Sequence, residues 1–304
     1  MIDITHKTHT LRSATAQAIV LVSKPETILA IERGMVPKGD VFSMSKAAGL
    51  LGVKKTPELL PDCHPLPIEY TGIDFEINGL EITVRCTIKT IYKTGVEVEA
   101  MHGVSVVALN MYDMLKPIDK GVEIRHIKLL KKQGGKSDYS DTFNKVLSAA
   151  VIVCSDSISE GKKEDYAGKA VMAKLESCGV LVKDYQIIPD EKELIQEKAK
   201  HYHQEGIDLI IFSGGTGLSH RDVTPEALLP LLERRIPGIE EAIRSYGQDR
   251  TPYSMLSRSV AGSLGESLLL ALPGSTKGAQ ESMDALFPAL LHIFRIFQGA
   301  KHDS

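Results

Sequence analysis

The chain has 304 residues, about twice the size of a typical single domain, so more than one domain is expected. Its 36 basic and 39 acidic residues give a formal net charge of −3, and this balance supplies no positive field of the kind that nucleic-acid binding requires. No apolar run approaches the length of a membrane span, and residues 1–10 lack the apolar core of a signal peptide. We therefore expect neither a nucleic-acid partner nor a membrane partner.

The first half of the chain contains two segments that restrain reactive side chains. Lys38 stands between a proline and a glycine, just before an apolar run. Cys63 and His64 lie between Pro61 and Pro65, and each proline fixes its own φ and disfavours a helix at the preceding residue. This stiff setting suits proton transfer by the imidazole, which titrates near neutral pH. The alternative is a small buried thiol beside a structural histidine.

Further along, acidic and basic residues stand at regular spacings. Glu97 and Glu99 lie in a valine-rich segment, where a strand would place both carboxylates on one face. Such a pair is either a solvated surface or a site that lysines hold for proton exchange or metal binding. From Val104 onward the apolar residues recur at helical spacing, which puts Asp113 and Lys116 on one side of a helix.

Five motifs in these residues resemble the MoaC family of cyclic pyranopterin monophosphate synthases. They are KGDVF, LPDCHPL, KTGVEVEA, the YDMxK element at residues 112–116 and GGKS at residues 134–137. The resemblance implies an α+β domain of the ferredoxin-like type over residues 1–137, with helices on an antiparallel sheet. It also implies that a cyclised derivative of GTP is rearranged to a pyranopterin with a cyclic phosphate, with release of pyrophosphate.

The resemblance carries over residue by residue to a candidate site. The catalytic positions that it implies are Lys38, His64, Asp113 and Lys116, and the substrate-binding positions are Cys63, Glu97, Val98, Glu99 and Lys136. Two lysine ammonium groups would bind the anionic triphosphate and stabilise the leaving pyrophosphate. We favour Lys116, oriented by Asp113, as the acid or base over Cys63 as a nucleophile, because nothing in the sequence shows a stabilised thiolate. We name no cofactor for this domain.

Residues 131–145 are polar and nearly free of aliphatic side chains, and a buried-strand run follows at once. We therefore expect a linker over 138–146 and a second domain over 147–304. Strands are predicted at 149–154, 180–188, 208–213 and 268–272, with helices near 166–177 and 191–204 and a long final helix through Ile296. This alternation predicts an α/β doubly wound, mainly parallel sheet covered on both faces.

Polar turns follow the strands of this sheet, where α/β proteins bind their ligands. They include residues 155–157, the Asp190 turn and the glycine-rich run at 213–217. The glycines allow successive N–H groups to turn toward an anion, so this loop is either a phosphate nest or a plain turn. Thr224 and Pro225 predict a helix start, with Thr224 as the N-cap.

The motifs SDS, IPDE, SGGTG, RDVTPE and LPGS, within residues 147–300, resemble the MogA/MoaB family and its molybdopterin-binding fold. Active members transfer an adenylyl group from ATP to molybdopterin with magnesium. Their essential acidic residues match Asp190 and Asp222, which are the implied catalytic residues and magnesium ligands. The implied substrate-binding positions are Ser155, Ser213, Gly214, Gly215, Thr216, Gly217, Pro273, Gly274 and Ser275.

Three interpretations of the whole chain stay open: a bifunctional enzyme, a synthase carrying a binding-only second domain, and a synthase whose second half mediates assembly. The substrates expected are the cyclised GTP derivative, molybdopterin and ATP. Both families form assemblies with threefold symmetry, so we expect a homo-oligomer, with a hexamer as the favoured form. Four cysteines without CxxC spacing, together with pterin chemistry, predict a cytoplasmic protein without stable disulfides.

Overall fold

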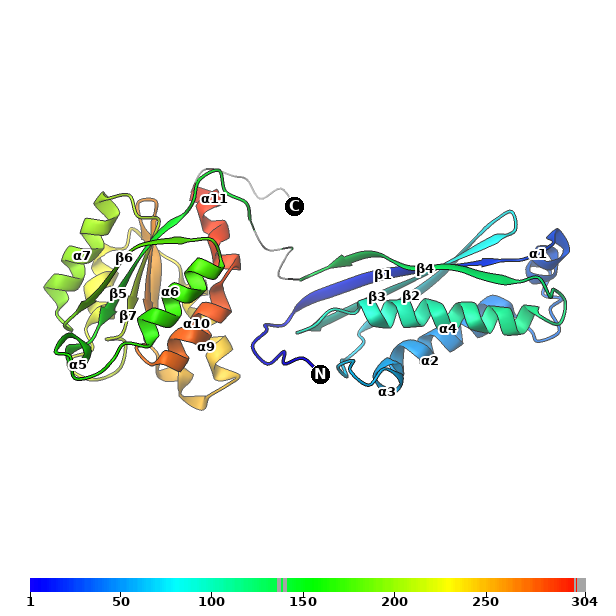
Figure 1. The fold of residues 1–304 in the computed structure, drawn as a ribbon, viewed down its shortest axis with the longest axis horizontal. Helices are drawn as coiled ribbons and strands as arrows, with labels where there is room; N and C mark the ends of the chain where they lie inside the picture. The colour runs from blue at the N-terminus through cyan, green and yellow to red at the C-terminus, as the bar shows by residue number, and fades with distance from the viewer. Residues whose placement is uncertain (136–137, 139–140, 298, 300–304) are drawn as a thin grey trace. The chain divides into compact units, whose positions relative to one another are not determined.

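The computed structural model describes residues 1–135, 138, 141–297 and 299. The chain divides into two compact units, Met1–Asp138 (unit 1) and Tyr139–Ser304 (unit 2). Their elements are labelled in Figure 1, and each unit is described by itself. In the part of the chain that the structure describes, no helix is long and apolar enough to cross a membrane.

Unit 1 is an antiparallel sheet with helices on one face (Figure 1). In chain order its elements are β1 (Thr10–Leu21), α1 (Pro25–Glu32), α2 (Val41–Lys54), α3 (Thr56–Leu59), β2 (Tyr70–Asn78), β3 (Glu81–Tyr92), α4 (Glu97–Leu115) and β4 (Glu123–Gln133). The sheet order is β2-β3-β1-β4. Buried alanines on β1, at positions 14, 16 and 18, leave room for α4 to pack closely against the sheet.

The strand considered for Glu97 and Glu99 is wrong, because both residues lie in the first turn of α4. Val96, Ala100 and Val104 are fully buried, so the helical spacing of apolar residues begins well before the predicted start. Burial of that face overrides the β propensity of the valines. Residues two apart on a helix project to different sides, so the two carboxylates do not share a face.

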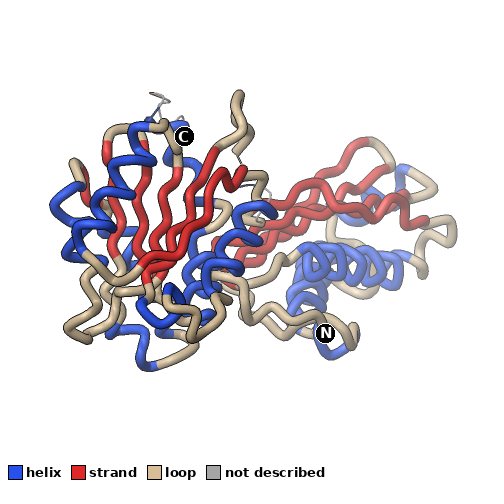
Figure 2. Tube along the Cα trace, turned by 60° about the vertical axis from the view of Figure 1, so that its left-hand side comes forward, coloured by secondary structure: helices blue, strands red, loops and turns tan. Residues whose placement is uncertain are grey.

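Unit 2 is a mixed, mostly parallel sheet between two layers of helices (Figure 2). Its strands are β5 (Ser148–Cys154), β6 (Leu181–Ile188), β7 (Leu209–Ser213), β8 (Arg234–Arg235), β9 (Val260–Leu264) and β10 (Ser267–Leu272), in the order β6-β5-β7-β10-β9-β8. The first four in that order are parallel, and β9 and β8 pair antiparallel at one edge. The prediction of a mainly parallel sheet is confirmed.

The helices of unit 2 form two apolar layers. One core packs under α6 (Ala167–Ser177), α9 (Pro237–Gln248) and α10 (Thr276–Leu286), and the other under α7 (Lys192–Gln204) and α8 (Thr224–Leu228). Short elements complete the unit: α5 (Asp156–Ser159), η2 (Leu229–Leu231), η3 (Pro252–Leu256), η4 (Ala289–His292) and α11 (Ile293–Phe297).

Two local predictions in unit 2 are wrong. The long final helix is broken after Leu286, because Pro288 lacks an N–H donor and holds Phe287 in extended geometry. Thr224 is the first residue of α8 and Val223 is its N-cap, so the threonine hydroxyl does not cap the helix.

The second half of the expected linker is bonded to unit 2. The Asp141 carboxylate accepts bonds from His292 Nδ1 and Arg295, both at 2.7 Å. Lys145 pairs with the mostly buried Asp208 at 2.5 Å. These contacts attach the segment from Asp141 onward to the surface of unit 2.

Candidate active sites on the two units

Three predicted residues of unit 1 meet at the carboxyl end of α4. Asp113 lies in the last turn of that helix, Lys116 is its C-cap, and Lys38 precedes α2. The Asp113 carboxylate pairs with Lys38 Nζ at 2.5 Å and with Lys116 Nζ at 2.7 Å. Hydrogen bonds from Lys116 and then Lys38 lower the pKa of Asp113 to about 2.

The same pairing acts on the lysine. Its hydrogen bond to Asp113 raises the pKa of Lys116. Lys116 is therefore protonated in this state and holds its proton more tightly than a free lysine does. A role as an acid or a base requires a ligand to displace the Asp113 carboxylate from it.

The Cys63 and His64 segment meets the amino end of α4. The Cys63 thiol donates to Glu99 Oε1 at 3.2 Å, and Glu99 is only 2% exposed. Burial, followed by the Glu99 contact, raises the pKa of Cys63 to about 11, so the thiol is protonated. Burial also raises the pKa of Glu99. His64 Nε2 lies 2.8 Å from the carbonyl oxygen of Ile2, to which it donates a bond.

A basic pocket of about 390 Å³ opens beside this end of α4. Four cationic and two acidic residues line it. The cations are Lys7, Arg12, Lys93 and Lys132, and the acidic residues are Glu97 and Asp138. Lys132 pairs with Glu97 at 3.4 Å, and the Arg12 guanidinium donates to the carbonyls of Tyr92 and Lys93. A polyanion with several phosphates fits this concentration of positive charge.

The predicted residues of unit 1 therefore form two groups in one copy of the chain. Glu97 lies in the first turn of α4 and Asp113 in the last, about 24 Å apart along the axis at the usual helical rise. Val98 is exposed on α4, and Lys136 lies outside the described residues. Sequence reasoning missed the pocket cations, although Lys93 opens the quoted KTGVEVEA motif.

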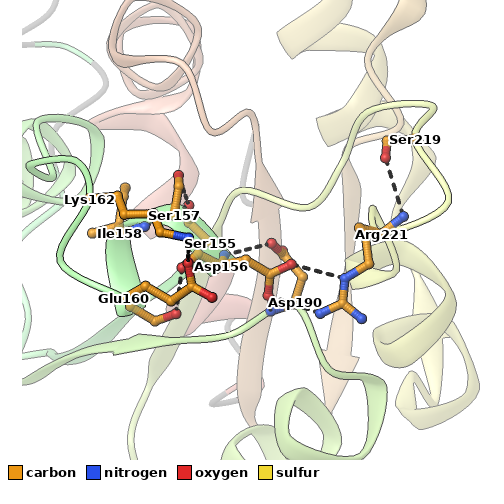
Figure 3. Close-up of polar contacts among 10 residues, drawn as sticks. Ser155, Asp156, Ser157, Ile158, Glu160, Lys162, Asp190, Ser219 and Arg221 are labelled. Carbon is orange, nitrogen blue, oxygen red and sulfur yellow. Dashed lines mark hydrogen bonds and ion pairs between the residues drawn. The ribbon is translucent and has the colours of Figure 1, made fainter.

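In unit 2, three neighbouring parallel strands bring their following loops to one edge. Asp156 follows β5, Asp190 follows β6, and Arg221 lies in the loop after β7 (Figure 3). The backbone N–H of Asp156 donates to Asp190 Oδ2, and that of Asp190 donates to Asp156 Oδ1, each at 3.0 Å. Arg221 binds both Asp156 oxygens, each at 2.9 Å. Ser155 caps α5 through Ile158 N–H and so fixes the start of this loop.

The glycine-rich loop lies against the other oxygen of Asp190. Gly214 and Gly215 have φ of +107° and +60°, which favour glycine. A Cβ on Gly215 would lie 2.3 Å from Thr224 Oγ1 and 2.8 Å from Asp190 Oδ1. These two oxygens are buried, and within the described ranges neither makes a hydrogen bond of normal geometry. Burial, with Asp156 and Asp222 nearby, raises the pKa of Asp190.

Asp222 lies against Gly217 of the same loop. Its Oδ2 accepts the Ser219 N–H at 2.7 Å and lies 2.9 Å from where a Gly217 Cβ would be. Arg258 fixes the segment by donating to the carbonyls of Gly217 and Asp222, at 2.8 and 2.7 Å.

A pocket of about 530 Å³ lies beside this loop. The predicted residues that line it are Thr216, Gly217, Pro273, Gly274 and Ser275. Ser275 also caps α10 by accepting the Gly278 N–H. Ser213 and Gly214 lie next to this group, since Ser213 Oγ donates to the Pro273 carbonyl and a Gly274 Cβ would approach Gly214. Sequence reasoning missed other residues that line this pocket, including Thr251, Tyr253 and Lys277.

Asp156 and Arg221 were quoted within motifs but not selected as site residues. Their position in the sequence could have identified them, because Asp156 directly follows Ser155 and Arg221 directly precedes Asp222 at the carboxyl edge of the sheet. Among the described residues, no group of three or more His, Cys, Asp or Glu side chains could hold a metal ion by itself. Any metal at Asp190 and Asp222 would therefore share its coordination with other donors.

Comparisons with known proteins match both halves. A family model described as "MoaC family" matches residues 1–135, and one described as "Probable molybdopterin binding domain" matches residues 150–292. The chain is 39% identical over 302 residues to the molybdenum cofactor biosynthesis bifunctional protein of Chlorobaculum tepidum, covering 99% of this chain and 96% of that one.

Each half also matches shorter proteins. The cyclic pyranopterin monophosphate synthase of Pelobacter propionicus is 48% identical over 139 residues, which are 45% of this chain and 86% of that one. A crystal structure of the molybdopterin biosynthesis enzyme MoaB from Thermus thermophilus matches at 39% identity and a TM-score of 0.49, covering 51% of this chain and 98% of that one. The resemblance stated from the motifs is thus confirmed, and the chain belongs to the family of molybdenum cofactor biosynthesis bifunctional proteins, as an enzyme that joins a MoaC half to a molybdopterin-binding half.

Proposed function

We propose that unit 1 converts the cyclised GTP derivative to cyclic pyranopterin monophosphate and releases pyrophosphate. The main support is that charged groups lie at both ends of α4. The basic pocket is at one end, and Lys38, Asp113 and Lys116 are at the other. The pocket cations bind the triphosphate and stabilise the charge that develops on the leaving pyrophosphate. Once the substrate displaces Asp113 from it, Lys116 exchanges protons during the ring rearrangement.

The separation of these two groups supports a site shared between copies of the chain. A substrate of this size cannot touch both ends of a 19-residue helix. A second copy that presents its Lys38 and Lys116 to the basic pocket would complete the site. Exposed apolar side chains on α4, including Val98 and Leu109, suit such a contact. We propose a homo-oligomer on this ground, and a hexamer as its form.

We propose that unit 2 transfers the adenylyl group of ATP to molybdopterin. An oxygen of the pterin phosphate attacks the α-phosphorus, a new P–O bond forms, and the bond to the β-phosphate breaks to release pyrophosphate. The pocket beside Thr216 and Ser275 would take an organic substrate, and the N–H groups of the glycine loop would bind phosphate.

Magnesium fits the carboxylates at this site. Mg²⁺ is usually bound by one or two carboxylates together with substrate phosphates. The buried Asp190 Oδ1 and the Thr224 hydroxyl, neither with a normal hydrogen bond in the described residues, are oxygen donors of the required kind. Asp222, beside Gly217, supplies a second carboxylate. When bound, the ion would neutralise charge on the phosphates.

The alternative for unit 2 is binding without catalysis. A binding domain would need only the pocket, whereas Asp190 is a carboxylate whose charged form burial and two like charges disfavour. Such a costly arrangement is typical of catalytic sites, so it favours the enzyme.

We also assign unit 1 to the ferredoxin-like type, supported by its strand order. Four free cysteines support a cytoplasmic location.

The test for unit 1 is product formation from the cyclised GTP derivative by the purified full chain. We expect pyranopterin and pyrophosphate in equal amounts from the parent protein and none from Lys116→Ala. Asp222→Asn, which changes only unit 2, is the control and should leave this reaction intact. Product from Lys116→Ala at the parental rate would refute the assignment of unit 1.

A further inference from the structure

The carboxyl edge of unit 2 holds an arginine whose partner can be exchanged. The Arg221 guanidinium lies against the Asp156 carboxylate (Figure 3) and binds both of its oxygens at 2.9 Å. The Arg221 side chain is 60% exposed. Both side chains of the pair are exposed to solvent, so separating them buries no unpaired charge. The planar fork that binds a carboxylate also binds a phosphate through the same two donors.

The position of this pair places the guanidinium next to the phosphate-binding loop. Asp156 contacts Asp190 through the two reciprocal backbone bonds, and Asp190 Oδ1 lies against Gly215. Asp190 therefore contacts both Asp156 and the glycine loop.

Arg258 provides the contrast. Its guanidinium donates to two backbone carbonyls, those of Gly217 and Asp222, and pairs with Glu226. Moving Arg258 would leave those carbonyls without their donor, whereas moving Arg221 exposes one carboxylate to water.

We propose that Arg221 is a phosphate-binding residue for the nucleotide of unit 2, and that Asp156 is a positioning residue that holds Arg221 when no nucleotide is bound. Binding transfers the guanidinium from the Asp156 carboxylate to a phosphate of ATP. Asp156 thus competes with the nucleotide for Arg221, and it weakens nucleotide binding while it keeps the arginine in place. This inference rests on ATP as the proposed substrate of unit 2.

The competition predicts opposite effects for the two partners. Arg221→Ala should weaken ATP binding by about tenfold or more, the range of a hydrogen bond to a charged group. Arg221→Lys keeps the charge but loses the fork, so its affinity should lie between. Asp156→Asn releases Arg221, while its side-chain oxygen can still accept the Asp190 N–H, so ATP should bind several-fold more tightly.

The experiment is calorimetric titration of the full chain with ATP and Mg²⁺. Every sample also carries Lys38→Ala and Lys132→Ala, which weaken anion binding on unit 1. Glu191→Gln is the matched control, because it removes a carboxylate that acts on Arg221 through its charge alone. The decisive sample combines Asp156→Asn with Arg221→Ala, in which the gain from Asp156→Asn should disappear.

Two results would overturn the inference. In the first, the tighter ATP binding of Asp156→Asn persists without Arg221, or Glu191→Gln reproduces it. Either outcome would mean that binding responds only to the change in net charge. Weaker binding by Asp156→Asn in a protein with the parental melting temperature would mean that the pair acts as one fixed unit. Adenylyl transfer measured on the same samples separates this inference from the proposed function. If adenylylated molybdopterin forms but the affinity for ATP does not depend on Arg221, only the exchange of Arg221 between Asp156 and phosphate is refuted. If ATP binding depends on Arg221 but no product forms, only the proposed reaction is refuted.

Discussion

Gly215→Ala tests whether the glycine loop and Asp190 form one site. Gly215 has φ of +60°, and a Cβ there would lie 2.3 Å from Thr224 Oγ1 and 2.8 Å from Asp190 Oδ1. The left-handed backbone costs a non-glycine residue roughly 1–2 kcal/mol. Overpacking of a filled site adds typically about 1–3 kcal/mol. The substitution should therefore destabilise unit 2 by about 2–5 kcal/mol unless Asp190 moves away.

Gly179→Ala is the matched control, because Gly179 has φ of +76° but no atom within 4 Å of its Cβ position. It should cost only the backbone share, roughly 1–2 kcal/mol, and leave adenylyl transfer intact. Since the chain has two units, stability is best measured by hydrogen exchange of the β5 and β7 amides, which report on unit 2 alone.

Relaxation of Gly215→Ala can take two routes, and both remove activity. If the loop holds, the strain appears as lost protection of β5 and β7; if Asp190 swings outward, protection recovers but the carboxylate leaves the site. Adenylyl transfer should fall at least tenfold in either case. The reasoning would be refuted if Gly215→Ala matched Gly179→Ala in both protection and transfer.

Three further predictions follow. Mixed assemblies of Lys116→Ala and Lys132→Ala chains, each inactive alone, should recover about a quarter of synthase activity if each site takes its residues from two copies, and none if a single copy supplies them all. Burial raises the pKa of Asp190 above its ordinary value of 3.8, so the parent chain loses stability as the pH rises through the raised pKa. Asp190→Asn should therefore gain stability relative to the parent over that rise in pH, and a difference in the free energy of unfolding that stays constant with pH would contradict this. Cys63→Ser should keep most synthase activity, because the Cys63 pKa of about 11 leaves a protonated thiol that only donates to Glu99. Loss of activity in a folded Cys63→Ser protein would instead indicate that Cys63 acts as a nucleophile.

The sequence predicted the elements of unit 2 well because its buried strands are continuous apolar runs. Leu209–Ser213 is fully buried, and its flanking turns are glycine-rich or polar. The segment around Glu97 failed for a physical reason. Valines at 96 and 98 suit a strand locally, and only the packing of Val96, Ala100 and Val104 against the sheet makes them a helix.

The candidate sites show the same limit. Motifs identify single residues, such as Asp190 and Lys38, but pairs come from tertiary structure. The bond between Asp156 and Arg221 joins loops 65 positions apart in the chain. The four cations of the unit 1 pocket come from segments spread between residues 7 and 132, so no local pattern predicts their convergence. Conversely, the motifs name residues at both ends of α4 without revealing that one copy keeps them apart.

The central claim is that one chain carries two separate enzymes, and its most direct test is adenylylation of molybdopterin. The purified chain, with ATP and Mg²⁺, should form adenylylated molybdopterin and pyrophosphate. Asp222→Asn should form neither while it retains pyranopterin synthesis by unit 1. Molybdopterin that binds to the parent chain without any adenylylated product would contradict the claim and make unit 2 a binding domain attached to a single enzyme.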